Sequence, residues 1–142
     1  MVQVVEVYKI DVTTKRKLPL YLSLVKAGFP SPAEDYLDKK LDLNEHLIKH
    51  PAATFFVKVK GDSMVNAGIH SGDILIVDRS LEPKDKKIVV AVVNGEFTVK
   101  RVRKKVEKLY LVSENEDFAP IEITKDMDFE IWGVVVHVIH SV

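Results

Sequence analysis

The feature that most constrains the fold is a series of short strand-like runs that fills the chain from Thr54 onward. Each run is rich in β-branched and aromatic residues, and turn-forming residues separate it from the next. The expected strands cover residues 54–60, 74–78, 88–93, 96–103, 107–112 and 129–140. Asn94-Gly95, between two of these runs, is a strong signal for a two-residue hairpin turn. This pattern predicts a mainly β fold, a compact and partly closed β structure.

The first third of the chain mixes several patterns. Apolar residues alternate with polar ones over residues 2–12, which predicts a further strand. A basic segment at 13–17 is interpreted as a solvated linker. The Ser-Pro-Ala-Glu sequence that opens residues 31–40 has capping-box spacing and predicts a helix, and a weaker signal predicts a short helix over 42–49. We therefore expect short N-terminal helices ahead of the β-rich part.

The last expected strand is apolar on both faces. From Trp132 to Ile139 only His137 interrupts the apolar run. A strand that is buried on both sides suits either a core position or a dimer interface.

Composition excludes several classes of protein. The chain has no cysteine, so a disulfide framework and a thiol nucleophile are both excluded, and a reducing compartment such as the cytoplasm is expected. No apolar stretch reaches the ~18 residues of a membrane span, and the N-terminal apolar run carries charges, unlike a signal peptide. The formal net charge is zero, which gives no general argument for nucleic-acid binding.

Ser63 is the first candidate for a catalytic role. It lies in Lys60-Gly61-Asp62-Ser63-Met64, directly after the strand expected over 54–60. Rigid scaffolds often present reactive groups on loops at strand ends, but a serine hydroxyl needs a base to become a good nucleophile. The alternative is an ordinary turn serine, with Asp62 also in a turn role.

Lys100 is the candidate base. It lies in the strand expected over 96–103 and can accept a proton only when its amine is neutral. An unperturbed lysine has a pKa of about 10.4, which burial among apolar groups lowers. Phe97, Val99 and Val102 are the nearby candidates for that desolvation. The alternative is a strand lysine whose ammonium group stays in water.

Three motifs follow one another along the chain. They are Gly61-Asp62-Ser63-Met64, Gly72-Asp73-Ile74-Leu75-Ile76-Val77-Asp78 and Phe97-Thr98-Val99-Lys100-Arg101. In this order and spacing the chain resembles the LexA/UmuD family of self-cleaving serine–lysine peptidases, and within it the UmuD branch. The resemblance extends from Leu18 to Val135 and implies a LexA- or signal-peptidase-like β fold.

The resemblance also implies a cleavage site and the residues that would catalyse the cleavage. The family is cut at the position of Ala27, before Gly28, which would divide the chain into a movable N-terminal arm, 1–27, and a β-rich peptidase-like body, 28–142. Ser63 would be the nucleophile and Lys100 the general base. Backbone N–H groups of Ser63 and Met64 would bind the oxyanion. This chemistry requires no metal and no cofactor.

Partners follow from the same resemblance. They are a second copy of the chain in a homodimer, a RecA–single-stranded-DNA filament that promotes cleavage in the SOS response to DNA damage, and a Y-family, UmuC-like polymerase for translesion synthesis. The 27 residues before the cut are too few for a helix-turn-helix domain, so direct sequence-specific DNA binding is not expected. Membrane association is not expected either, because no apolar stretch has the length of a membrane anchor.

Other interpretations remain open from the sequence. The chain suits a non-enzymatic polymerase accessory module with an idle dyad, or an anti-repressor of the same fold. His137 and His140 are alternative bases, although core or surface roles suit them as well.

Two further features have ordinary explanations. His46 and His50 have helical spacing but no third ligand, so no metal is expected. The basic cluster Arg101, Arg103, Lys104 and Lys105 suits a solvated turn or an acidic partner.

Overall fold

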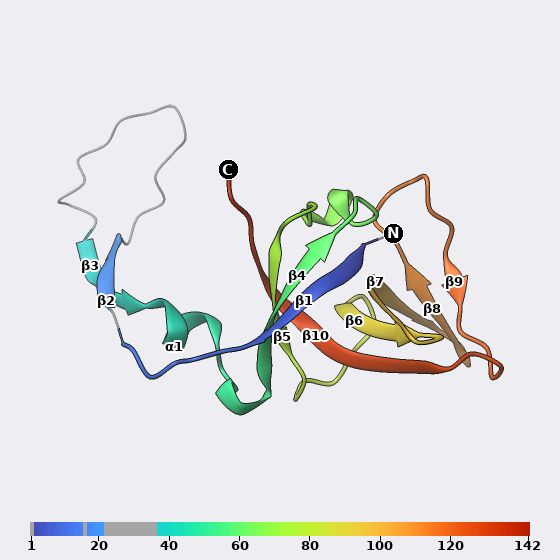
Figure 1. Cartoon of the computed structure of the whole chain (residues 1–142), viewed down its shortest axis with the longest axis horizontal. Coiled ribbons are helices and arrows are strands. Elements are labelled where there is room, and N and C mark those ends of the chain that lie inside the picture. Colours follow the sequence, from blue (N-terminus) through green and yellow to red (C-terminus); the bar gives the residue numbers. More distant parts are fainter. Residues whose placement is uncertain (1, 16, 22–36) are drawn as a thin grey trace. The chain divides into compact units, whose positions relative to one another are not determined.

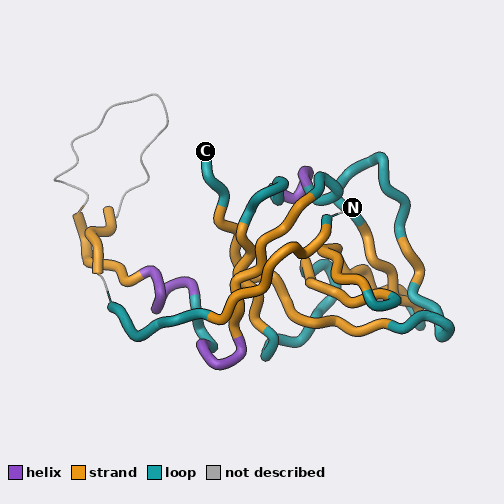
Figure 2. The backbone as a smooth tube through the Cα atoms, in the orientation of Figure 1, coloured by secondary structure: helices purple, strands orange, loops and turns teal. Residues whose placement is uncertain are grey.

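The computed structural model describes residues 2–15, 17–21 and 37–142. Two compact units emerge from the contacts within the chain. The barrel unit comprises Met1–Ile10 together with His50–Val142, and the second unit comprises Asp11–Lys49. Strands dominate both units and the helices are short (Figures 1 and 2).

The barrel unit is built on one eight-stranded sheet in the order β1-β4-β5-β10-β6-β7-β8-β9. Its strands are β1 (Gln3–Lys9), β4 (Thr54–Lys60), β5 (Ile74–Asp78), β6 (Ile88–Val93), β7 (Glu96–Lys105), β8 (Lys108–Val112), β9 (Ile121–Glu122) and β10 (Phe129–Ile139). All neighbouring strands in this order run antiparallel. β1 also pairs with β7 through Gln3 and Thr98, which closes six strands into a barrel (Figure 1).

The hairpin between β6 and β7 follows from its turn residues. Asn94 and Gly95 both have positive φ, at 49° and 82°, as the two central residues of a type I′ turn require. Val93 pairs with Glu96 across the turn, and this register places Lys100 opposite Val89. The local Asn-Gly signal therefore fixes where Lys100 falls on β7.

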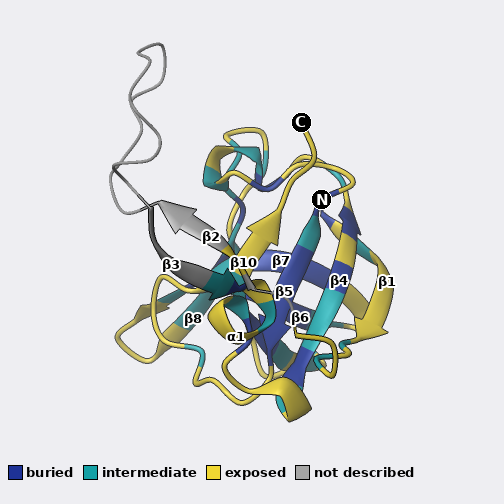
Figure 3. Cartoon of the chain, turned by 90° about the vertical axis from the view of Figure 1, so that its left-hand side faces the viewer, coloured by how far each residue is buried: buried dark blue, intermediate teal, exposed yellow. Residues whose placement is uncertain are grey.

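Two apolar clusters fill the interior of the barrel unit, and Figure 3 shows buried residues along β4, β5 and β7. The first cluster consists of Val2, Val57, Val59, Met64, Ile69, Leu75, Val77, Val90 and Val99. The second cluster consists of Val89, Ala91, Val102, Leu111 and Val134. Side chains alternate along β7, so Val99 belongs to the first cluster and Val102 to the second.

The expected strands are confirmed with small changes. Strands 54–60, 74–78 and 88–93 match to the residue, and the strand expected over 96–103 continues to Lys105. β1 is shorter than the predicted range 2–12. The two-residue strand β9 was not predicted, because so short a run carries no alternation.

The second half of the last strand is not in the core of the single chain, and the dimer-interface alternative stays a prediction. β10 lies between β5 and β6 and is bent by two bulges, near Gly133 and His137. Val138 and Ile139 are 37% and 43% exposed. They pair with Leu75 and Ile74 at the rim of the barrel, where no further layer covers their outer side chains in the described chain.

One helix predicted for the second unit is partly wrong. The helix predicted over 31–40 is wrong for residues 37–40, because β3 (Leu37–Asp42) pairs antiparallel with β2 (Lys17–Tyr21). The capping signal at 31–34 lies outside the described residues. The pairing of β2 with β3 outweighs the helix propensity of these residues, because that propensity is only a local effect.

The second predicted helix is confirmed in a shorter form. α1 (Leu43–Leu47) begins after Asp42, whose side chain accepts a hydrogen bond from the backbone N–H of Asn44 at 2.9 Å. Asp42 thus acts as the N-cap that the sequence pattern indicated.

Candidate active site

The loop after β4 holds Ser63 inside the barrel unit. Ser63 is fully buried, which is unusual for a turn serine. Gly61 has φ of 114°, a conformation that only glycine adopts easily. The carbonyl of Asp62 accepts hydrogen bonds from the Val65 N–H and from the Asn115 side chain. These bonds give Asp62 a turn role and hold the loop that carries Ser63.

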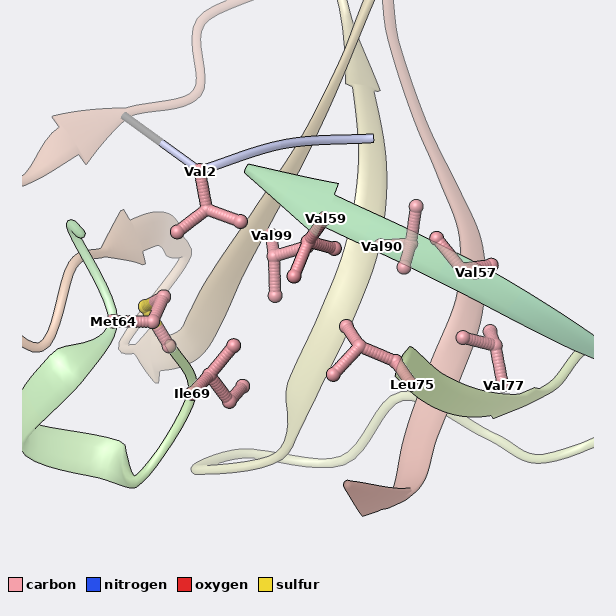
Figure 4. Close-up of a cluster of buried hydrophobic side chains, with 9 residues drawn as sticks. All are labelled: Val2, Val57, Val59, Met64, Ile69, Leu75, Val77, Val90 and Val99. Carbon is pink, nitrogen blue, oxygen red and sulfur yellow. The ribbon is translucent and has the colours of Figure 1, made fainter. Parts of the chain in front are cut away.

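Met64 anchors the same loop from inside. Its side chain is fully buried in the first apolar cluster, beside Val99 and Ile69 (Figure 4). Its sulfur atom also accepts a weak hydrogen bond from the Glu114 backbone N–H at 3.4 Å. The residue after Ser63 therefore cannot turn outward without opening the core.

The first residues of the chain occupy the space beside Ser63. The backbone N–H of Val2 donates a hydrogen bond to Ser63 Oγ at 2.7 Å. The Val2 carbonyl accepts bonds from Thr98 Oγ1 at 3.1 Å and from the Val99 N–H at 3.4 Å. The Val2 side chain is fully buried in the first cluster (Figure 4). The start of the chain thus bridges the serine loop and the strand that carries Lys100.

Lys100 is buried in the middle of β7, with an exposed fraction of 2%. Its Nζ donates a hydrogen bond to Ser113 Oγ, just beyond β8, and lies 5.8 Å from the centre of the Phe118 ring. Within the described residues Lys100 has no carboxylate at ion-pair distance. Burial lowers the pKa of Lys100 below its ordinary value near 10.5.

The expected sources of that burial are partly confirmed. Val102 and Val99 are fully buried, and Val102 shares the Lys100 face of β7 by strand alternation. Phe97 is 37% exposed and packs edge-on against Trp132 instead. Ser113 and Phe118 were not singled out in the sequence, since their contact with Lys100 arises only from the pairing of β7 with β8.

Ser63 and Lys100 are thus held in separate hydrogen bonds. No hydrogen bond joins them among the residues that the structure describes, and the dyad stays a prediction. The backbone N–H groups of Ser63 and Met64 have no acceptor within that part of the chain, which leaves both donors available for an oxyanion. Ala27 and Gly28 lie outside the described residues, and the boundary between arm and body at this bond stays a prediction.

The histidines have partners of their own. His50 Nδ1 lies 2.6 Å from Asp78 Oδ2, and His140 Nδ1 lies 2.6 Å from Asp73 Oδ1. His137 is exposed on β10 and His46 lies in α1. Within the described residues no histidine bonds to Ser63.

The basic cluster at the β7–β8 hairpin is largely engaged in local contacts. Arg101 pairs with Glu114, Arg103 approaches Asp85 at 3.7 Å, and Lys105 stacks on Tyr110 at 5.6 Å. These contacts favour the solvated-turn interpretation.

Comparison with known proteins identifies the family. The family model described as Peptidase S24-like matches residues 19–136. The chain belongs to this family. The match confirms the resemblance to LexA/UmuD proteins and indicates a peptidase kind of activity.

Individual relatives agree with this family. The chain is 46% identical to Protein MucA of Salmonella typhimurium over 84% of its own length and 82% of that protein. It is 46% identical to Protein ImpA of Shigella flexneri over 86% of its length and 83% of that protein. It is also 40% identical to the LexA repressor of Shewanella denitrificans, over 92% of this chain and 63% of the repressor.

Among the described residues, no helix has both the length and the apolar character needed to cross a membrane.

Proposed function

We propose that this chain is a self-cleaving serine peptidase whose Ser63–Lys100 dyad cuts its own Ala27–Gly28 bond. The observation that carries the proposal is Lys100, a fully buried lysine without a carboxylate partner in the described chain, in a member of a peptidase family. Burial favours the neutral amine, the only form that can take the Ser63 proton. An ordinary structural lysine would keep its ammonium group in water.

The reaction is acyl transfer to the Ser63 hydroxyl. Neutral Lys100 accepts the Ser63 proton as Oγ attacks the Ala27 carbonyl carbon. The oxyanion accepts hydrogen bonds from the backbone N–H groups of Ser63 and Met64. The C–N bond to Gly28 then breaks, Lys100 returns its proton to the leaving amine, and water hydrolyses the ester to release the carboxylate of Ala27.

Two hydrogen bonds must change before this reaction. Val2 N–H holds Ser63 Oγ, and Ser113 Oγ holds Lys100 Nζ. Release of the Val2 contact frees the space that the Ala27–Gly28 bond must enter. The lysine side chain must also move until Nζ lies within about 2.6–3.2 Å of Ser63 Oγ. Val2, directly before β1, therefore acts as an occupant that competes with the cleavable bond.

The biological setting of the proposal rests on family membership and on the MucA, ImpA and LexA relatives. The chain acts in SOS mutagenesis, a RecA–single-stranded-DNA filament promotes its cleavage, and the 28–142 fragment forms a dimer that joins a Y-family polymerase. It works in the cytoplasm.

The decisive test is the conversion of purified chain to the 28–142 fragment, followed by intact mass. Conversion is expected at alkaline pH for the unmodified chain and is abolished in Ser63→Ala and in Lys100→Ala. The matched control, Lys104→Ala, changes an exposed lysine of the same strand and keeps the activity. Conversion that survives in Ser63→Ala would overturn the proposal, because a contaminating protease would then explain the cut.

The second candidate is a non-enzymatic polymerase accessory or anti-repressor module with an idle dyad. The separate engagement of Ser63 and Lys100 favours it. A chain that stays intact at every pH, with and without a RecA filament, would select this alternative.

The boundary between arm and body has its own test. The 28–142 fragment lacks β1, which closes the barrel. It also lacks Val2, whose side chain is fully buried in the intact chain. We expect the fragment to fold and dimerise, with a lower melting temperature than the intact chain. An unfolded fragment, by circular dichroism, would make β1 an obligatory part of the core.

A further inference from the structure

A second cluster of side chains lies at another place in the barrel unit. It consists of His70 and Asp73, both in the loop between the Ser63 turn and β5, and His140, directly after β10. One ligand atom from each residue lies within 4.8 Å of the other two. The proposed peptidase activity uses none of these side chains.

Asp73 is the fixed member of this cluster. Its side chain is 2% exposed, and Oδ2 accepts a hydrogen bond from the His70 backbone N–H at 2.8 Å. The loop around it is tied to β4, since the Val59 N–H donates to the Asp73 carbonyl and the Gly72 N–H donates to the Val59 carbonyl. A buried carboxylate on a braced loop is a pre-positioned oxygen ligand.

The two imidazoles approach this carboxylate together. His140 Nδ1 lies 2.6 Å from Oδ1 and His70 Nδ1 lies 3.8 Å from Oδ2. The ring centroids are 4.8 Å apart and the rings are inclined by 38°. Both side chains are about half exposed. Two protonated rings would repel each other here, whereas one cation between neutral rings and the carboxylate attracts all three ligands.

We propose that His70, Asp73 and His140 form a binding site for a divalent transition metal ion, with Zn²⁺ as the best fit. Two imidazole nitrogens and one carboxylate oxygen are ligands that zinc accepts, and water completes the four-coordinate shell. Metal–ligand distances of about 2.0–2.2 Å require neighbouring ligand atoms to lie roughly 3.3 Å apart. The two histidine–carboxylate separations, 2.6 and 3.8 Å, lie on either side of that spacing, and the three ligand atoms lie within 4.8 Å of one another. Rotation of the two half-exposed histidine side chains would complete the site.

The proposed ion links the C-terminal end of β10 to the loop that follows Ser63. That loop is bonded to Val59, four residues before the nucleophile candidate. Metal binding should therefore stabilise the folded barrel unit in proportion to metal concentration, because a ligand that binds only the folded state raises its stability.

The test uses the full-length chain without a histidine tag, in a Ser63→Ala background that prevents self-cleavage. Zn²⁺ is titrated by calorimetry, and Co²⁺ is titrated by visible absorption, which reports a four-coordinate site with nitrogen ligands. We expect one ion per chain, and a higher melting temperature that a chelator reverses. His140→Ala and His70→Ala should each weaken binding by at least about tenfold, by analogy with losses around known metal sites.

His137→Ala is the matched control, because it removes an exposed histidine from β10, the strand that His140 directly follows. It should bind the ion as the background chain does. Absence of binding, or equal affinity in His140→Ala and the background, overturns the proposal. This result is independent of the proposed peptidase activity, since no variant in the test can cleave itself.

Discussion

The two halves of the candidate active site are held in different ways. Ser63 is engaged by Val2, which lies 61 positions earlier in the chain and belongs to the segment that cleavage would remove. Lys100 is engaged by Ser113, 13 positions later, across the β7–β8 hairpin. The serine contact can be lost when the N-terminal strand leaves, whereas the lysine contact is built into the barrel.

This comparison indicates where regulation would act. In the proposed mechanism the lysine contributes without departure of any backbone segment, because its surroundings already favour the neutral amine. The serine needs the departure of a whole backbone segment. An activating partner should therefore act mainly on β1, and the predictions below separate the two contributions.

The largest expected effect is the pH dependence of cleavage. The neutral fraction of Lys100 grows about tenfold for each pH unit below its pKa, so the cleavage rate should rise in that proportion and then level off. The measurement is the rate of formation of the 28–142 fragment from mildly acidic to strongly alkaline pH. A histidine base would instead reach its plateau near neutrality, given a pKa of about 6.5.

The next effect concerns the contact between the N-terminal segment and Ser63. Val2→Pro removes the backbone N–H that Ser63 accepts, and Val2→Ala keeps that N–H but loses apolar burial. Burial of a valine side chain contributes roughly 1.5–3 kcal/mol. Its complete loss would therefore raise the equilibrium constant for release of the strand by about 10- to 100-fold at most.

Both Val2 variants should therefore cleave faster at a fixed pH. Val5→Ala is the matched control, because Val5 lies in β1, three residues after Val2, and its side chain is about half exposed. Equal rates in all three variants would show that β1 does not compete with the cleavable bond.

A smaller effect is expected on stability. The folded-state pKa of Lys100 is lowered, so the unfolded chain binds more protons between that pKa and about 10.5. The free energy of unfolding should therefore rise with pH across this window and change no further above it. Each unit of pKa difference corresponds to about 1.36 kcal/mol.

Lys100→Met replaces the amine by an apolar group of similar length and should remove this pH dependence. Urea unfolding of Ser63→Ala and of the Ser63→Ala, Lys100→Met double variant, at neutral and alkaline pH, provides the measurement. A parallel pH dependence in both chains would contradict the assignment to Lys100.

The smallest effect is expected from Ser113→Ala. The Ser113 hydroxyl accepts a bond from Lys100, so its removal costs about 1 kcal/mol of stability. It also removes a partner of the charged amine, which lowers the pKa of Lys100 further and should shift the cleavage profile to lower pH.

Ser141→Ala, at an exposed serine near the C-terminus, is the control for Ser113→Ala. A cleavage profile that shifts to higher pH in Ser113→Ala would contradict this prediction. It would mean that Ser113 positions the lysine for catalysis rather than restraining it.

Local sequence patterns are enough to predict the β-rich fold class, because β-branched runs and turn residues act over a few neighbouring positions. The same patterns predict more than the fold class. They placed β4, β5 and β6 to the residue, and Asn94-Gly95 set the register that carries Lys100. Through the family resemblance of its motifs, the sequence also indicated Ser63 and Lys100 as the candidate nucleophile and base.

The contacts of these residues depend on tertiary pairing. The closure of the barrel by β1, the bond from Val2 to Ser63 and the bond from Lys100 to Ser113 join segments that no local pattern connects. The same limit explains the error at residues 37–40, where a helix-capping signal yielded to pairing with β2. Long-range backbone pairing outweighs local propensity because each ladder bond and buried side chain adds to the stability of the whole sheet.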